Sequence, residues 1–170
     1  MRRLPAFVSL ILAVAMLAPA FALAAPAIVF LTRHAEKATE GNDPNLTAQG
    51  QARARNLARL LAKAGITAVF STPTSRTRQT AQPLAVQSGV EAQLYDPAKP
   101  GTLVDKAKAA IGAAMIVGHS NTVPGLVSLF GGAPGAPIGD NEYDRLYQLI
   151  LHADGSVTTV LLTSAADIHP

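Results

Sequence analysis

Arginine and histidine side chains follow an apolar run near the start of this sequence. Residues 28–31 are consecutively apolar, Thr32 comes next, and Arg33 and His34 follow it. A short apolar run of this kind is typical of a buried strand, and ligands of open α/β sheets bind beyond the carboxyl ends of the strands. A guanidinium can grip an oxyanion with paired N–H donors, and an imidazole can act as nucleophile, base or ligand. The pair therefore indicates a site for an anionic group.

Two later apolar runs end in the same way. Residues 67–71 lead through a polar loop to Arg76, and residues 114–117 are followed by Gly118 and His119. We expect the carboxyl ends of these strands to meet at one edge of the sheet, next to helix N-termini that attract anions. Two arginines and two histidines suit a phosphoryl group, whose three equatorial oxygens carry charge during transfer.

The elements that must position these residues alternate along the chain. We expect strands at 28–31, 67–71, 90–95, 114–117, 145–152 and 156–163, and helices at 48–64, 75–87, 102–111 and 123–130. Thr47 is the expected N-cap of the first helix, and Gly65 and Gly89 suit the ends of the first and second. The last two strands form a hairpin with its turn at Asp154 and Gly155. This order predicts one α/β domain with a largely parallel sheet.

The first 24 residues are expected to be a cleaved signal peptide rather than part of the fold. Arg2 and Arg3 precede an apolar stretch, and small residues around Ala24 and Ala25 offer cleavage after either alanine. Two prolines in this stretch argue against a permanent membrane anchor. Residues 25–170 are then an exported domain, periplasmic or secreted.

Composition narrows the possible partners. The sequence contains no cysteine, so neither a disulfide nor a thiolate metal site is available. Its formal charge is +3, and removing Arg2 and Arg3 leaves twelve basic against eleven acidic residues, a charge of +1. With no basic run and few aromatic residues, a nucleic-acid surface is not expected.

Four segments in order resemble the histidine phosphatase superfamily, which also contains the phosphoglycerate mutases. They are residues 31–36 (LTRHAE), 46–50 (LTAQG), 70–81 (FSTPTSRTRQTA) and 117–121 (VGHSN). The resemblance extends from residue 27 to about residue 162. It implies a three-layer α/β/α fold with a largely parallel central sheet, like that of phosphoglycerate mutase.

The resemblance also implies roles for matching residues. His34 would be the nucleophile that forms a transient phosphohistidine, and Arg33 and Arg76 would clamp the phosphoryl oxygens. His119 would donate to the same group, and no metal or cofactor would be needed. Ser120 and Asn121 would either add donors to the substrate or simply cap the following helix.

The proton donor for the leaving group is not fixed by the sequence. Family members use a Glu beyond the second arginine or an Asp after the second histidine, and here Ser120 occupies the latter position. Beyond Arg76, Asp96 is the preferred candidate because it follows a predicted strand, although it also suits a turn before a proline. The remaining carboxylates to consider are Glu36, Glu91, Asp105 and Glu142.

Other functions fit the residues less well. A serine hydrolase elbow at Ser120 would lack its second glycine, at Thr122, and would need His152 or His169 as base. A metal site built from the two histidines and a carboxylate would place a dication beside two arginines. A non-catalytic phosphate binder and a phosphomutase remain as alternatives on the same scaffold.

The expected substrate is a phosphorylated small molecule or an envelope sugar phosphate, and a phosphoramidate would also fit. Only the loops at 38–45, 96–101 and 131–142 are available to shape the pocket. No long apolar stripe is left to demand a partner, so a monomer is possible.

Overall fold

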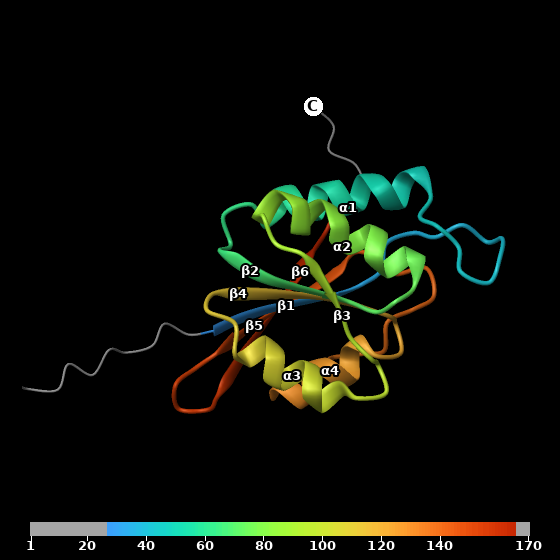
Figure 1. Ribbon diagram of the computed structural model, residues 1–170. Coiled ribbons are helices and arrows are strands. Elements are labelled where there is room, and N and C mark those ends of the chain that lie inside the picture. The colour runs from blue at the N-terminus through green and yellow to red at the C-terminus, as the bar shows by residue number, and fades with distance from the viewer. Residues whose placement is uncertain (1–26, 166–170) are drawn as a thin grey trace, which may run out of the picture.

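The computed structural model describes residues 27–165, which form a six-stranded sheet between two layers of helices (Figure 1). The strands are β1 (Ala27–Arg33), β2 (Ile66–Ser71), β3 (Ala92–Leu94), β4 (Ala113–Gly118), β5 (Arg145–Leu151) and β6 (Val157–Thr163). The helices are α1 (Ala48–Leu60), α2 (Ser75–Ser88), α3 (Pro100–Lys108) and α4 (Val123–Phe130). The predicted signal peptide lies outside the described residues.

The sheet is mostly parallel, as predicted. Its strand order is β3-β2-β4-β1-β5-β6. Strands β1 to β4 run parallel to their neighbours among themselves, whereas β5 is antiparallel to β1 and β6 is antiparallel to β5. The carboxyl ends of β1, β2 and β4 therefore meet at one edge, with β1 between β4 and β5.

Both faces of the sheet are buried because strand residues point alternately to opposite sides. In β4, Met115 and Val117 pack with residues of α1 and α2, while Ala114 and Ile116 pack with residues of α3 and α4. Figure 1 shows the same arrangement, with α1 and α2 above the sheet and α3 and α4 below it. This packing confirms the three-layer α/β/α fold.

Helix α1 is anchored at its N-terminus to the chain that leaves β1. Thr47 is the N-cap, and its hydroxyl accepts a hydrogen bond from Gly50 N at 3.1 Å. Gly50 lies so close to the segment after β1 that an added Cβ would stand 2.1 Å from the Glu36 carbonyl oxygen. A glycine is required at this contact because any side chain would collide with backbone.

Some element boundaries differ from those predicted. Helix α1 ends at Leu60, and residues 61–64 form a turn before Gly65, whose φ is +67°. Strand β3 is confined to three residues, and α3 starts two residues early, where Pro100 can occupy the first turn at no cost in hydrogen bonds. Helices α2 and α4 and the closing hairpin agree with the prediction to within a residue or two.

Among residues 27–165, no helix is both long enough and apolar enough to cross a membrane.

Candidate active site

The adjacent ends of β1 and β4 bring His34 and His119 together. Arg33 pairs with Gly118 in the parallel register, and His34 N donates to the Gly118 carbonyl at 2.9 Å. The imidazole centroids of the two histidines lie 5.5 Å apart in an edge-to-face arrangement. Two residues that are 85 positions apart in the sequence thus form one site through the strand pairing.

Arg33 is held by the loop that precedes β5. The residue is 7% exposed, and its Nη1 donates to the carbonyl oxygens of Gly139, Asp140 and Glu142 at 2.8, 2.8 and 3.0 Å. The ring of Tyr143 covers the guanidinium, with 4.2 Å from Cζ to the ring centroid, a cation–π distance. These contacts fix the plane of the guanidinium.

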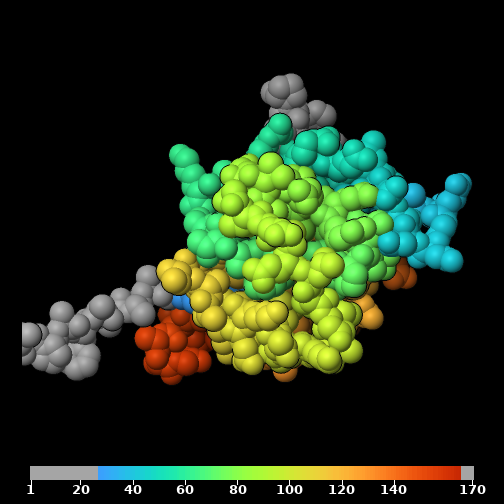
Figure 2. Space-filling model, in the orientation of Figure 1, coloured from blue at the N-terminus to red at the C-terminus, as the bar shows by residue number. Residues whose placement is uncertain are grey.

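Arg76 enters from the first turn of α2, beside the loop between β1 and α1. Asp43 of this loop accepts hydrogen bonds from the backbone N and the hydroxyl of Ser75, at 2.9 and 2.7 Å. Its carboxylate also lies 3.6 Å from Nη1 of Arg76. Ser75 and, more weakly, Arg76 lower the pKa of Asp43. Figure 2 shows the segment between β1 and α1 projecting from one side of the molecule.

Both arginines keep one buried nitrogen without a partner. The Nε of Arg33 and the Nε of Arg76 are inaccessible to solvent, and neither has a hydrogen-bond partner among the described residues. A buried N–H left unpaired costs free energy. An oxyanion between the two guanidinium groups would satisfy both donors and would bring negative charge to two cations.

His34 has the properties of a nucleophilic imidazole. Its Nδ1 lies 2.8 Å from the Ala35 carbonyl, so Nδ1 carries the proton and donates it. Burial, together with the charges of Arg33 and Arg76, lowers the pKa of His34 to about 4. The ring is therefore neutral at pH 7, and its Nε2 lone pair has no partner among the described residues.

His119 is neutral for the same reasons. Burial and the neighbouring Arg76 and Arg33 lower its pKa to about 4. Its Nε2 lies 3.0 Å from the buried hydroxyl of Thr72. That hydroxyl lies 2.8 Å from the hydroxyl of Thr77, which in turn lies 2.8 Å from the hydroxyl of Thr74. A chain of three hydroxyls thus ends on the His119 ring.

Three of the carboxylates considered as proton donors, Asp96, Glu36 and Glu142, are engaged with other partners. Asp96 is exposed and accepts a hydrogen bond from Ala98 N at 2.9 Å, as expected for a turn residue. Glu36 forms an ion pair with Arg53 at 2.6 Å. Burial alone would raise the pKa of Glu36, but hydrogen bonds from Arg53 lower it overall.

The third carboxylate near the site, Glu142, pairs with the guanidinium of Arg145, which lowers its pKa. Glu91 and Asp105 are exposed, and Asp105 lies on α3. The lowered pKa values of Glu36 and Glu142 keep both side chains ionised near pH 7, which makes them poor proton donors.

The alternative sites receive no support from the geometry. His152 lies in the β5–β6 hairpin, where its Nε2 is 2.9 Å from the Thr158 hydroxyl, and His169 lies outside the described residues. Within residues 27–165, no three histidine or acidic side chains are grouped as a metal site. Ser120 and Asn121 precede α4, next to His119, and Asn121 is exposed.

Several residues at the site were not predicted. Tyr143 and the carbonyl oxygens of residues 139–142 carry no local signal, because they reach Arg33 only through the pairing of β5 with β1. Thr72 lies within a segment singled out by the resemblance, but its contact with His119 depends on the distance between β2 and β4.

Comparison with known protein families agrees with this geometry. Residues 29–97 match the sequence model of the histidine phosphatase superfamily (branch 1), a range that includes Arg33, His34 and Arg76. The resemblance to the histidine phosphatase superfamily is confirmed. No curated protein sequence matches the chain.

Solved structures of histidine phosphatases and related enzymes share the fold. The protein histidine phosphatase SixA in complex with tungstate is 20% identical with a TM-score of 0.65, over 81% of this chain and 96% of SixA. A mycobacterial glucosyl-3-phosphoglycerate phosphatase with inorganic phosphate is 15% identical with a TM-score of 0.65, over 84% and 99% of the two chains. At these identities the similarity establishes the fold alone.

A third similar structure is the phosphoserine phosphatase of Entamoeba histolytica in complex with 3-phosphoglyceric acid. It is 16% identical with a TM-score of 0.62, over 82% of this chain and 98% of that one.

Proposed function

We propose that this protein is a metal-independent phosphatase that hydrolyses phosphomonoesters or phosphoramidates through a phosphohistidine at His34. The observation that carries the proposal is the pair of buried, unpartnered Nε–H groups on Arg33 and Arg76 beside a neutral imidazole. Two fixed cations can neutralise a phosphoryl dianion and hold phosphorus against the lone pair of His34.

In the first chemical step, His34 Nε2 attacks phosphorus and a nitrogen–phosphorus bond forms. The bond from phosphorus to the leaving oxygen or nitrogen breaks, and its electron pair departs with the leaving group. The hydrogen bond from His34 Nδ1 to the Ala35 carbonyl stabilises the positive charge that develops on the ring. In the second step, water attacks phosphorus, the nitrogen–phosphorus bond breaks, and inorganic phosphate is released.

Arg33, Arg76 and His119 stabilise the equatorial oxygens in both steps. When His119 accepts a hydrogen bond from Thr72 at Nε2, its proton lies on Nδ1 and can be donated to a phosphoryl oxygen. The backbone and side chain of Asn121 and the backbone of Ser120, at the start of α4, supply further donors to the bound substrate.

The leaving group takes its proton from solvent, because Asp96, Glu36 and Glu142 are all engaged with other partners. This favours substrates whose leaving groups need little protonation, such as aryl esters and phosphoramidates. The enzymes of similar fold support the oxyanion site, since one was solved with tungstate and another with inorganic phosphate.

The test is hydrolysis of a generic aryl phosphate by the purified protein, with and without a chelator. We expect chelator-resistant turnover and an acid-labile phosphoprotein in quenched reactions, both absent in His34→Ala. Full turnover by His34→Ala would contradict the mechanism. Absence of turnover in the wild-type protein, with tungstate still raising its melting temperature, would favour the non-catalytic binder.

We also propose that the protein acts after export, because residues 1–24 have the pattern of a signal peptide. N-terminal sequencing of the protein from its native host should give Ala25 or Pro26 as the first residue. An intact N-terminus on the protein of the soluble cytoplasmic fraction would contradict export.

A further inference from the structure

A cavity lies beside the phosphoryl site, at the same edge of the sheet. It measures about 350 Å³ and opens between the loop after β3 and the first turns of α4. Its lining includes Tyr95, Pro97, Pro100, Asn121, Leu126 and Leu129. We call it the β3–α4 pocket. Its volume falls within the range of small-molecule sites.

The β3–α4 pocket is continuous with the residues around His119. Its lining residue Thr122 accepts a hydrogen bond from His119 N at 3.0 Å, and Asn121, two residues after His119, also lines it. Tyr95, which also lines the pocket, donates its hydroxyl proton to the Val117 carbonyl at 3.4 Å, two residues before His119. A substrate whose phosphoryl group contacts His119 therefore has this pocket within reach of its leaving group.

The lining of the β3–α4 pocket is apolar and uncharged. Two prolines, two leucines and a tyrosine form most of it, and the polar groups are the amide of Asn121 and the hydroxyl of Thr122. No lysine, arginine, aspartate or glutamate lines it. A charged leaving group would lose water there without gaining a counter-ion, which is unfavourable. An apolar ring face would gain from burial.

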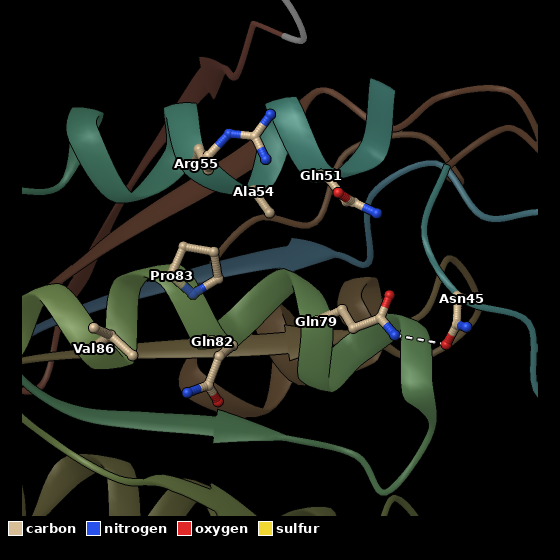
Figure 3. Close-up of a pocket in the computed structure, with 8 residues that line it drawn as sticks. All are labelled: Asn45, Gln51, Ala54, Arg55, Gln79, Gln82, Pro83 and Val86. Carbon is tan, nitrogen blue, oxygen red and sulfur yellow. Dashed lines mark hydrogen bonds between the residues drawn. The ribbon is translucent and has the colours of Figure 1, made fainter. Parts of the chain in front are cut away.

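A different cavity, of about 530 Å³, lies between α1 and α2 and is edged by amides and Arg55 (Figure 3). None of Arg33, His34, Arg76 and His119 lines this groove, and its lining residue Gln79 bonds both Asn45 and the backbone N of Leu46.

We propose that the β3–α4 pocket holds the leaving group of the substrate, and that this group is an uncharged ring with an apolar face, either aryl or glycosyl. The inference rests on the proposed phosphatase function and adds the substrate class to it. It sets this protein apart from enzymes of similar fold whose ligands carry a carboxylate, such as 3-phosphoglyceric acid.

The first experiment compares substrates that are matched in size and differ in charge. We expect kcat/KM for 4-carbamoylphenyl phosphate to exceed that for 4-carboxyphenyl phosphate by about tenfold or more. Glucose 1-phosphate against glucuronic acid 1-phosphate gives the same comparison for a glycosyl group. The ring type that shows the higher kcat/KM distinguishes an aryl from a glycosyl substrate.

Variants then locate the selectivity in the pocket. Leu129 is 52% exposed and lines the pocket, whereas Leu60 on α1 is 53% exposed and does not. Leu129→Lys should shift the carbamoyl-to-carboxy ratio of kcat/KM at least fivefold toward the carboxylate, and Leu60→Lys should leave the ratio unchanged. Equal ratios in both variants and the wild type would overturn the proposal.

A filling variant gives a second test. Gly125 lines the pocket, and an added Cβ there would have no heavy atom within 4 Å, so a larger side chain is expected to fill part of the pocket. Gly125→Leu should lower the kcat/KM ratio of naphthyl phosphate to acetyl phosphate by about tenfold, since acetyl phosphate has no ring to lose. A ratio that does not change would place the leaving group elsewhere.

A binding measurement separates failure of this inference from failure of the proposed function. Phenylphosphonate and 4-carboxyphenylphosphonate cannot be turned over as esters, and calorimetry gives their affinities without catalysis. Tighter binding of the uncharged ligand, lost in Gly125→Leu, supports the pocket even if no phosphate ester is hydrolysed. Equal binding of the two phosphonates contradicts the pocket even if the protein is a phosphatase.

Discussion

The most specific feature of the site at the scale of single residues is the contact between Thr72 and His119. A neutral imidazole has one donor and one acceptor, so the partner of one nitrogen decides what the other can do. When the Thr72 hydroxyl donates its proton to His119 Nε2, 3.0 Å away, the proton of the His119 ring lies on Nδ1. Thr72 is therefore a positioning residue for His119.

We predict that Thr72→Val lowers kcat about three- to tenfold, in line with one hydrogen bond, while Thr72→Ser restores it. The ¹⁵N shifts of the His119 imidazole in histidine-labelled protein provide the second readout. They should report a proton on Nδ1 in the wild type and a loss of that preference in Thr72→Val. Unchanged shifts would show that Thr72 does not set the tautomer.

A second residue-scale prediction concerns Tyr143, which stacks on Arg33. Tyr143→Leu removes the aromatic face, so we expect phosphate or tungstate to bind more weakly by about 0.5–2 kcal/mol. Tyr143→Phe keeps the face and should bind like the wild type. If Tyr143→Phe binds the anion as weakly as Tyr143→Leu does, then the phenol hydroxyl rather than the ring supports binding. Isothermal titration calorimetry distinguishes the outcomes.

The sequence was sufficient for those site residues that lie at or just after the carboxyl end of a strand. Arg33, His34 and His119 were located because each comes after an apolar run, and Arg76 because it follows the next polar loop. Tyr143 could not be found in this way, because its position depends on the antiparallel addition of β5 beside β1. The sequence also could not exclude Glu36 as the proton donor. Its ion pair with Arg53 joins the segment after β1 to α1, and this contact appears only in the folded chain.

At the scale of elements, the tight contact between α1 and the segment after β1 is the feature with the clearest consequence. Gly50 is in a helix, where alanine is ordinarily better by about 1 kcal/mol. A Cβ added at Gly50 would collide with the carbonyl oxygen of Glu36, which lies two residues after His34. Because of this backbone contact, replacing Gly50 by alanine is expected to destabilise the fold, although the same replacement usually stabilises a helix.

We predict that Gly50→Ala destabilises the fold by about 1–3 kcal/mol, as overpacking does, and lowers turnover by displacing the segment that carries His34. Gly101 in α3 is the matched control, since its added Cβ meets nothing within 4 Å. Gly101→Ala should stabilise the protein by up to about 1 kcal/mol. Urea unfolding of both variants measures the difference, and equal stabilisation would refute the contact.

Local patterns predicted the elements well where periodicity was strong. Helices α2 and α4 and the β5–β6 hairpin were found near their true ends because a glycine or a turn pair marks each boundary. The predicted helix 48–64 ran too far because Leu61 and Ala64 continue its apolar spacing. In the structure, residues 61–64 form a turn instead. Strand β3 was shorter than expected, since only residues 92–94 pair with β2.

At the scale of the whole molecule, the buried His34 and the half-buried His119 couple stability to pH. In the unfolded chain they bind protons near pH 6.5, whereas in the fold their pKa values are lowered to about 4. Between these values the unfolded state binds more protons, so stability rises with pH. The stabilisation is complete above pH 6.5 and is lost as the pH falls toward 4.

We therefore expect the free energy of unfolding to drop between pH 6.5 and 4, by about 1.4 kcal/mol for each pKa unit of a buried histidine. Carboxylates such as Glu36 also lose ion pairs in acid, so the comparison needs a variant. In His34→Gln the drop should be smaller than in the wild type, as measured by urea unfolding at each pH. An identical drop in both proteins would mean that His34 titrates normally in the fold.

The position of β1 has a consequence for how the chain reaches its folded state. The first strand pairs with β4, more than 80 residues later, and with β5, about 120 residues later. Val29 and Leu31 therefore have no strand neighbours until most of the polypeptide is available, and such long-range pairings fold slowly. The His34–His119 pair therefore cannot form during synthesis until β4, with His119 directly after it, has been made.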